Sequence, residues 1–310
     1  MPNRVPRALV LSAVLLAVLA ACVAGCGDSS GPGAGSPSGK LRVVAAEDFW
    51  GSIAAQLGGD RVEVTSIITN PAADPHDYEP TSADARTRAA AQIAIVTGFG
   101  YDEWASTLLA ANPESSRVEL NVGEVLGLKD GDNPHQWYSP SSVQRVIDAI
   151  SAGYKRADPG NDPYFDRQRR KFETEGLAEY DELISQIKAS YAGTPVGASE
   201  SIFEPLAPAL GLKLITPKGF MDGIAEGTEP TPADKAGADR QIADNQIAVW
   251  VYNSQNATPD VQRLNDAAGA AGIPIATVTE TLTPEGASFQ DWMSRQLRGL
   301  RAALARSGAR

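Results

Sequence analysis

The 310-residue sequence predicts an α/β protein with two lobes, each a mainly parallel sheet flanked by helices, joined by one long spine helix. Three observations support this fold. Short β-branched runs alternate with helical stretches, which is typical of parallel sheets covered on both faces. A long charged stretch at residues 162–191 interrupts the alternation once, and the alternation then resumes. The length also exceeds that of one small domain.

Residues 1–26 have the pattern of a bacterial lipoprotein signal peptide and are not expected to belong to the fold. Arg4 and Arg7 precede an apolar run from Ala8 to Ala21. That run is shorter than the ~20 residues that usually span a membrane. Small residues follow it, as a signal peptide requires.

The apolar run ends at two cysteines, each in a lipobox-like setting. Val23-Ala24-Gly25-Cys26 resembles a lipobox, and so does Leu19-Ala20-Ala21-Cys22. We favour lipidation of Cys26, because residues 27–39 directly after it are rich in Gly, Ser and Pro and form a flexible tether. The alternative is plain secretion with cleavage nearby.

The N-terminal lobe is expected at residues 40–160. Thr81 and Asp84 have the spacing of a capping box, with Asp in place of Glu, so they mark the start of a helix. The pattern predicts strands at 41–46, 62–68, 93–97 and 118–122, and helices at 48–57, from 81 onward and at 102–111.

The spine helix is expected within residues 161–192, followed by the C-terminal lobe at residues 193–310. Gly176 is the single glycine in the spine, whose length would be ~45 Å at 1.5 Å per residue. Apolar residues recur at helical spacing in the last helix. The pattern predicts strands at 196–198, 213–216, 248–252 and 274–278, and helices at 202–210, 261–271 and 289–306.

Cysteine content and net charge argue against some kinds of site and partner. The chain has two cysteines, both within residues 1–26, so disulfides and thiolate metal sites are not expected in the folded part. The formal net charge of −11 argues against a nucleic-acid partner, because no basic footprint is present. The same charge would attract cations.

The two histidines of the chain occupy matching frames. His76 and His135 each follow an Asx-Pro pair and precede an aromatic residue two positions on and then a proline. Prolines on both sides stiffen a loop and reduce the entropy lost when the imidazole is held. Imidazole suits zinc, manganese, iron and similar ions. We therefore expect both histidines to ligate a transition metal.

Two histidines leave a metal site incomplete. Glu200 follows the strand at 196–198, and Glu280 follows the strand at 274–278. Ligands of parallel sheets bind beyond the carboxyl ends of the strands, so these acids are the expected partners. The remaining alternatives are Glu204, Glu226 and Glu229.

From Leu41 onward the sequence resembles the cluster A-I solute-binding proteins, the metal-binding receptors of bacterial zinc and manganese ABC transporters. The frame from Asp74 to Pro80 is similar to the first-ligand loop of that family, and the frame from Asn133 to Pro140 is similar to the second. Gly98-Phe99-Gly100-Tyr101-Asp102-Glu103-Trp104 resembles the family's Gly-x-Gly-x-x-x-Trp segment.

The resemblance implies two α/β lobes joined by one long helix, with a metal ion between them. It implies delivery to a membrane permease served by a separate ATPase, with the receptor anchored outside the cytoplasm by its lipid. Ser199-Glu200-Ser201-Ile202-Phe203 stands where zinc-type members have Ser-His-x-x-Phe, and Glu there is similar to manganese- and iron-type members. Glu280 stands where the family usually has Asp. The implied cargo is Zn²⁺ or Mn²⁺, with Fe²⁺ also compatible.

The chain departs from the family pattern at several points. Ser139 replaces a common Asp, Pro205 replaces a common aromatic residue, and the His-rich acidic loop of many zinc members is missing. Two other functions are alternatives: a secreted zinc hydrolase, and an adhesin or metallochaperone on the same fold. The sequence has no His-Glu-x-x-His motif for the first. It has no Gly-x-x-x-x-Gly-Lys-[Ser/Thr] loop, so any ATPase is a separate chain.

Overall fold

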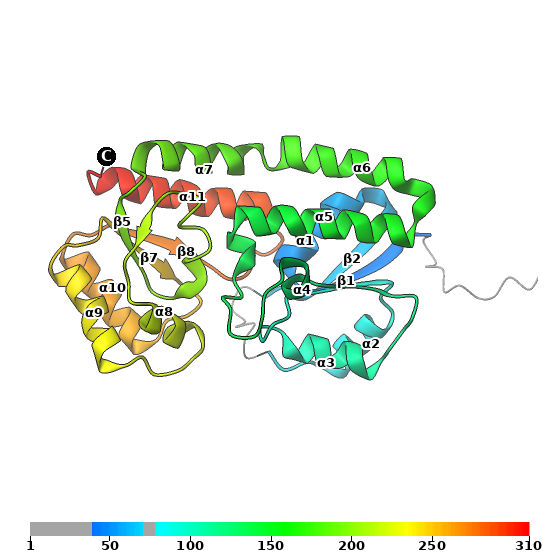
Figure 1. Ribbon diagram of the computed structural model, residues 1–310, viewed down its shortest axis with the longest axis horizontal. Helices are drawn as coiled ribbons and strands as arrows, with labels where there is room; N and C mark the ends of the chain where they lie inside the picture. The colour runs from blue at the N-terminus through cyan, green and yellow to red at the C-terminus, as the bar shows by residue number, and fades with distance from the viewer. Residues whose placement is uncertain (1–38, 71–77, 310) are drawn as a thin grey trace, which may run out of the picture. The chain divides into compact units, whose positions relative to one another are not determined.

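Two parallel sheets organise the chain (Figure 1). The computed structural model describes residues 39–70 and 78–309. The predictions about the signal peptide, Cys22, Cys26 and His76 fall outside the described residues. Across the ranges that are described, the helices are too short or too polar to cross a membrane.

The first sheet has the strand order β2-β1-β3-β4, and every neighbouring pair is parallel. All four residues of β3 are buried, as expected for a strand covered on both faces. Thr81 and Asp84 form the predicted capping box at the start of α2. The elements are β1 (Leu41–Glu47), α1 (Asp48–Gly58), β2 (Val62–Ile68), α2 (Ser82–Ala89), β3 (Ile93–Val96), α3 (Glu103–Ala111), β4 (Val118–Asn121), α4 (Val122–Leu126) and α5 (Pro140–Ala157).

The second sheet repeats this topology, with the parallel order β6-β5-β7-β8. All four strands have their carboxyl ends at one edge, where β7 lies between β5 and β8. The elements are β5 (Pro195–Ala198), β6 (Lys213–Leu214), α8 (Lys218–Ala225), α9 (Pro232–Ala243), β7 (Val249–Asn253), α10 (Pro259–Ala270), β8 (Ile275–Val278) and α11 (Phe289–Arg306).

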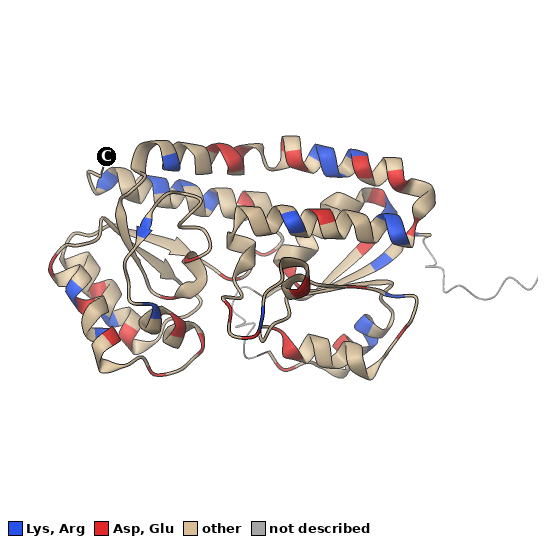
Figure 2. Cartoon of the chain, viewed as in Figure 1, with Lys and Arg blue, Asp and Glu red and all other residues tan. Residues whose placement is uncertain are grey.

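The spine differs from one regular helix. It consists of α6 (Asp162–Lys171), a π-helical turn at Phe172–Gly176 and α7 (Ala178–Tyr191). Leu177 N donates to Phe172 O, five residues back. A Cβ on Gly176 would lie 2.9 Å from the Phe172 ring, so glycine lets that ring pack against the turn. Basic and acidic residues alternate along α6 and α7, which identifies a solvated outer surface (Figure 2).

The predicted helix at residues 202–210 is wrong. The structure has a short 3₁₀-helix at Ser201–Phe203, followed by turns. Pro205 and Pro208 lie in this segment, and neither can donate a backbone hydrogen bond to continue a helix.

Helices α4, α5, α8 and α9 were not predicted. The longest of them, α5, begins at Pro140 after Ser139, whose side chain accepts from Ser142 N. Proline at the first helical position and serine at the cap are favourable. The loop that carries His135 therefore leads directly into a rigid helix.

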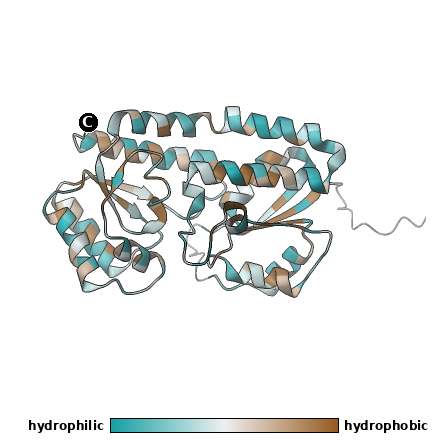
Figure 3. Cartoon of the chain, viewed as in Figure 1, coloured by the Kyte–Doolittle hydropathy of each residue, from teal (hydrophilic) through white to brown (hydrophobic). Residues whose placement is uncertain are grey.

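One hydrophobic core extends through both lobes. Phe49, Trp137, Trp292 and Leu297 belong to the same buried cluster, and Figure 3 shows hydrophobic residues in β1 and β2 and along α5. Helix α1 also hydrogen-bonds to the C-terminal lobe through three side chains one turn apart: Asp48 to Leu282 N, Ser52 to Phe289 N and Gln56 to the Gln290 side chain.

Candidate metal centre

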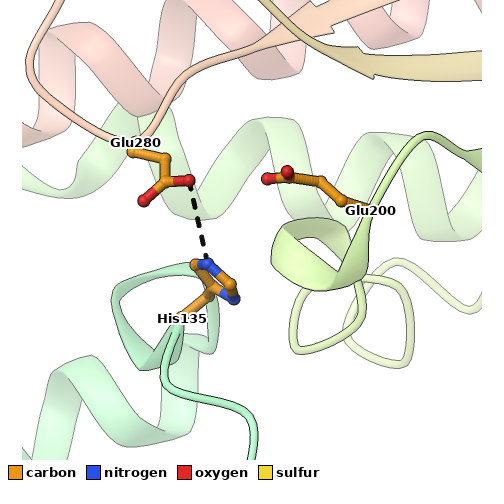
Figure 4. A group of neighbouring side chains, drawn as sticks. All are labelled: His135, Glu200 and Glu280. Atoms are coloured by element: carbon orange, nitrogen blue, oxygen red, sulfur yellow. Dashed lines mark ion pairs between the residues drawn. The ribbon is translucent and has the colours of Figure 1, made fainter. Parts of the chain in front are cut away.

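Three side chains with metal-ligating atoms meet where the loop before α5 faces the second sheet (Figure 4). Glu200 follows β5, Glu280 follows β8, and His135 comes from the N-terminal lobe. One candidate ligand atom from each lies within 4.8 Å of the others, and His135 Nε2 is 4.0 Å from Glu280 Oε1. All three side chains are buried. The structure brings together three of the four predicted ligands, and His76 lies outside the described residues.

Asn133 fixes the orientation of the His135 ring. The backbone N–H and Nδ1 of His135 lie 3.0 and 2.9 Å from Asn133 Oδ1. Asn133 Nδ2 donates to Ser201 O at 2.8 Å, which leaves Oδ1 as the acceptor. His135 Nδ1 therefore carries the proton, and Nε2 directs its lone pair toward the side of Glu280. That is the tautomer a metal ligand needs.

The Asn133 amide also joins the lobes. Besides its bond to Ser201 O, Nδ2 donates to Glu204 Oε2 at 2.9 Å, and both partners follow β5. Gln136 Nε2 donates to the Asn133 carbonyl at 2.8 Å and stiffens the loop. The imidazole is thus positioned by contacts within its own loop and by a contact with the opposite lobe.

Two asparagine amides hold the Glu200 carboxylate. The Glu200 backbone is extended, with φ −159° and ψ −179°. Asn253 Nδ2 donates to Glu200 Oε1 at 2.6 Å, and Asn256 Nδ2 donates to Oε2 at 2.8 Å. Neutral donors of this kind favour the ionised form of a carboxyl group without adding charge.

The Glu280 carboxylate is held from both lobes. Tyr101 OH, from the N-terminal lobe, donates to Oε2 at 3.0 Å. Asn253 Nδ2 donates to Oε1 at 3.2 Å. The backbone N–H of Glu280 donates to the Gln255 side chain, which fixes the loop after β8.

A strained turn places Tyr101. Gly98, Phe99 and Gly100 have φ values of 78°, 39° and 93°. Glycine is needed at position 98, because a Cβ there would meet Asn121 Oδ1 at 2.3 Å. Asp102 accepts from Thr97 N at 2.8 Å and from Gly98 N at 2.6 Å, and these bonds close the turn.

The alternative acids lie elsewhere. Glu229 is exposed and pairs with Lys235. Glu226 is exposed at the end of α8. Glu204 contacts Asn133 and Lys218. None of the three belongs to the cluster, which favours Glu200 and Glu280.

Sequence reasoning missed the side chains that hold the two acids. Asn253 and Asn256 donate to the carboxylates, and Gln255 accepts from the Glu280 backbone. Asn253 ends β7 and occupies the same kind of strand-end position that identified Glu200 and Glu280. A uniform search of strand ends for polar residues would have found it.

The N-terminal lobe contains a second pair of buried acids at the end of its sheet. Glu47 and Asp102 are fully buried, and Thr97 Oγ1 donates to Glu47 Oε2 at 2.8 Å. Burial, and then repulsion by Asp102, raises the pKa of Glu47 well above its ordinary value. Burial also raises the pKa of Asp102. Burial and mutual repulsion therefore disfavour the state in which both carboxyl groups are ionised.

A third acid, Asp48, lies where α1 meets the C-terminal lobe. Both oxygens of Asp48 lie 3.3 Å from Leu282 N. Burial raises the pKa of Asp48 to about 7, although the hydrogen bond from Leu282 opposes this shift. The carboxyl group therefore changes charge close to neutral pH.

The family model described as ZnuA, zinc-uptake complex component A, periplasmic, matches residues 43–303. The chain belongs to this family. The match confirms the resemblance seen in the loops around the histidines, and it includes all the residues that build the cluster.

Individual relatives agree with this ZnuA-family membership. The manganese-binding lipoprotein MntA of Halalkalibacterium halodurans is 27% identical over 122 residues, 38% of this chain and 40% of that protein. The chain thus spans less than half of that relative. The high-affinity zinc uptake system protein ZnuA of Bacillus subtilis is 24% identical over 291 residues, 87% of this chain and 89% of that protein.

A solved structure confirms the α/β fold of this ZnuA-family chain. The Cd-bound periplasmic metal binding protein from Candidatus Liberibacter asiaticus matches with a TM-score of 0.71 and 19% identity. The alignment covers 86% of this chain and 100% of that chain. At this identity the likeness concerns the fold.

Proposed function

We propose that this protein captures a divalent transition-metal ion between its lobes and delivers it to an ABC transporter permease with a separate ATPase. The observation that carries the proposal is the convergence of His135, Glu200 and Glu280, with one ligand atom from each within 4.8 Å of the others. His76 is proposed as the fourth ligand. Zn²⁺ or Mn²⁺ is the proposed cargo, and Fe²⁺ fits the same donors.

The charge balance supports a divalent ion. Two carboxylates and two neutral imidazoles sum to −2, which one M²⁺ ion neutralises. Burying two nearby carboxylates without a counter-ion is costly, whereas a bound cation offsets their repulsion. Zn²⁺ binds such donors more tightly than Mn²⁺, so discrimination depends on geometry and supply.

Burial favours capture over catalysis. A zinc hydrolase keeps one metal position open for water and substrate. His135 and Glu200 are 0% exposed and Glu280 is 3% exposed, so these ligands do not line an open surface. Capture, closure and release need no chemical change in the cargo.

Calorimetry with Zn²⁺ and Mn²⁺ tests the site. We expect Glu200→Gln and Glu280→Gln each to weaken binding at least ~10-fold, since even residues that support ligands are worth 10–100-fold. Glu229→Gln is the matched control, because Glu229 is exposed in the same lobe and pairs with Lys235. Unchanged affinity in both Glu200→Gln and Glu280→Gln would contradict the proposed metal site.

The proposed anchor is a lipid on Cys26, which would hold the receptor outside the cytoplasm at the cell membrane. Mass spectrometry of the mature N-terminus should find a diacylated cysteine at position 26. A lipid on Cys22 would move the anchor by four residues and keep the tethered receptor. A mature chain that begins at another residue type would contradict the anchor and leave the metal site untouched.

A further inference from the structure

A single buried amide lies between the two carboxylates of the candidate metal centre. Asn253 is 0% exposed. Its Nδ2 donates to Glu200 Oε1 at 2.6 Å and to Glu280 Oε1 at 3.2 Å. Each carboxylate also has a donor of its own, Asn256 for Glu200 and Tyr101 for Glu280. The two hydrogen bonds of Asn253 thus connect the two acids to each other.

The strand order explains why this position bridges both acids. β7 is the strand between β5 and β8, and β5 and β8 lead to Glu200 and Glu280. Asn253 is the last residue of β7 and pairs in register with Val278, two residues before Glu280. A side chain at the end of β7 is therefore the one with an acid on each side.

The direction of the amide is set by its other contacts. Asn253 Oδ1 accepts from Gln255 N at 3.0 Å, which assigns the oxygen and directs Nδ2 toward the carboxylates. Asn253 N donates to Ser199 Oγ at 3.0 Å, so the backbone is held as well. The two bonds to the acids thus depend on an amide that cannot rotate freely.

The chemistry of the amide suits a metal site. It reduces the repulsion between two carboxylates but leaves their full negative charge for the cation. A Lys or Arg here would compete with the metal, and an Asp would add a third negative charge. Glu280 Oε1, which accepts from Asn253, is also the oxygen that lies 4.0 Å from His135 Nε2. The same carboxylate oxygen therefore faces both the Asn253 amide and the His135 imidazole.

We propose that Asn253 is a positioning residue that sets the separation and orientation of Glu200 and Glu280 for one divalent ion. This inference rests on the proposed function. Asn253 would affect the metal ion only through Glu200 and Glu280. It predicts that removal of the amide alters the coordination geometry as well as the affinity.

The experiment compares the full-length wild type with Asn253→Ala, Asn253→Ser and Asn256→Ala. Calorimetry with Zn²⁺ gives the affinity, and the visible absorption spectrum of bound Co²⁺ reports the ligand geometry. Asn253→Ala should weaken Zn²⁺ binding by roughly 10–100-fold and change the Co²⁺ spectrum. Asn253→Ser keeps one hydroxyl donor and should lose less Zn²⁺ affinity. It also provides a second variant if Asn253→Ala does not fold. Asn256→Ala removes the bonds from Asn256 to Glu200 and to the Ile224 carbonyl but leaves both bonds of Asn253 in place, so it should lose less affinity than Asn253→Ala.

A second control separates site effects from the general loss of a buried hydrogen bond. Asn265 accepts from Trp250 Nε1 in the same lobe, so Asn265→Ala should leave affinity and spectrum unchanged. The inference is overturned by unchanged affinity in Asn253→Ala, by an unchanged Co²⁺ spectrum, or by equal losses in Asn253→Ala and Asn256→Ala. If Glu200→Gln and Glu280→Gln also bind normally, the proposed function fails. If they lose affinity and Asn253→Ala does not, only the role of Asn253 fails.

Discussion

In the N-terminal sheet Glu47 ends β1 and Thr97 follows β3, whereas in the C-terminal sheet Glu200 follows β5 and Asn253 ends β7. The strand orders match, so these positions correspond. Each acid accepts a hydrogen bond from the neighbouring strand end. The same topology therefore creates the same local arrangement twice.

The two acid pairs differ in what compensates their burial. Burial raises the pKa values of Glu47 and Asp102, and the buried guanidinium of Arg88 opposes that rise. Glu200 and Glu280 are bridged by a neutral amide and face the His135 imidazole. Where two buried carboxyl groups face no ligand-binding side chain, a bound proton can relieve their repulsion. A pair that faces an imidazole is suited to a metal ion.

The largest expected effect comes from removing an imidazole. We expect His135→Ala, and likewise His76→Ala, to weaken Zn²⁺ or Mn²⁺ binding at least ~100-fold, because a direct ligand should matter no less than the residues behind it. Calorimetry measures the loss, and Glu229→Gln again serves as the unaffected control. A variant of either histidine that binds as tightly as the wild type would remove that histidine from the site.

Glu47→Gln tests the difference between the pairs directly. Glutamine resembles the protonated acid, so metal affinity should stay unchanged, in contrast to Glu200→Gln. The raised pKa of Glu47 makes the wild type lose stability as pH rises from the unfolded pKa toward the folded pKa. Urea unfolding across pH should show a smaller loss in the variant. If Glu47→Gln lost as much metal affinity as Glu200→Gln, the proposed difference between the two acid pairs would be wrong.

Asp48→Asn should have the smallest effect. The pKa of Asp48 is about 7 in the folded protein, above the ordinary value of 3.8. Wild-type stability should therefore fall between about pH 4 and pH 7, at about 1.4 kcal/mol per pKa unit as an upper limit. As the pH rises through this range, the melting temperature of Asp48→Asn should increase relative to that of the wild type. The exposed Glu63 provides Glu63→Gln as a control, and parallel curves for wild type and Asp48→Asn would contradict the assignment.

Much of the fold could be predicted because parallel sheets have a strong local signature. The strands at 41–47 and 62–68 and the helix at 289–306 follow from β-branched runs and apolar spacing. The helix at 202–210 was mispredicted because its apolar spacing outweighed Pro205 and Pro208. The π-helical turn depends on how the Phe172 ring packs over Gly176, which periodicity does not reveal.

The candidate site was predictable where residue type and strand position coincide. Glu200 and Glu280 are acids at strand ends, and His135 lies in a distinctive loop. Asn253 is a common residue type at a strand end, and its role depends on Gln255 N–H fixing the amide. Such a contact becomes visible only once the strand order is known.

The hydrogen bonds of Asn133 link contact between the lobes to metal affinity. Its Nδ2 reaches Ser201 and Glu204 in the opposite lobe, while its Oδ1 holds the His135 Nδ1 proton. Parting the lobes would break the first two bonds and release the amide that selects the imidazole tautomer. Lobe contact and ligand readiness are therefore thermodynamically linked. By reciprocity, an ion that gains affinity from contact between the lobes strengthens that contact by the same factor. Any process that separates the lobes would therefore lower the affinity for the ion.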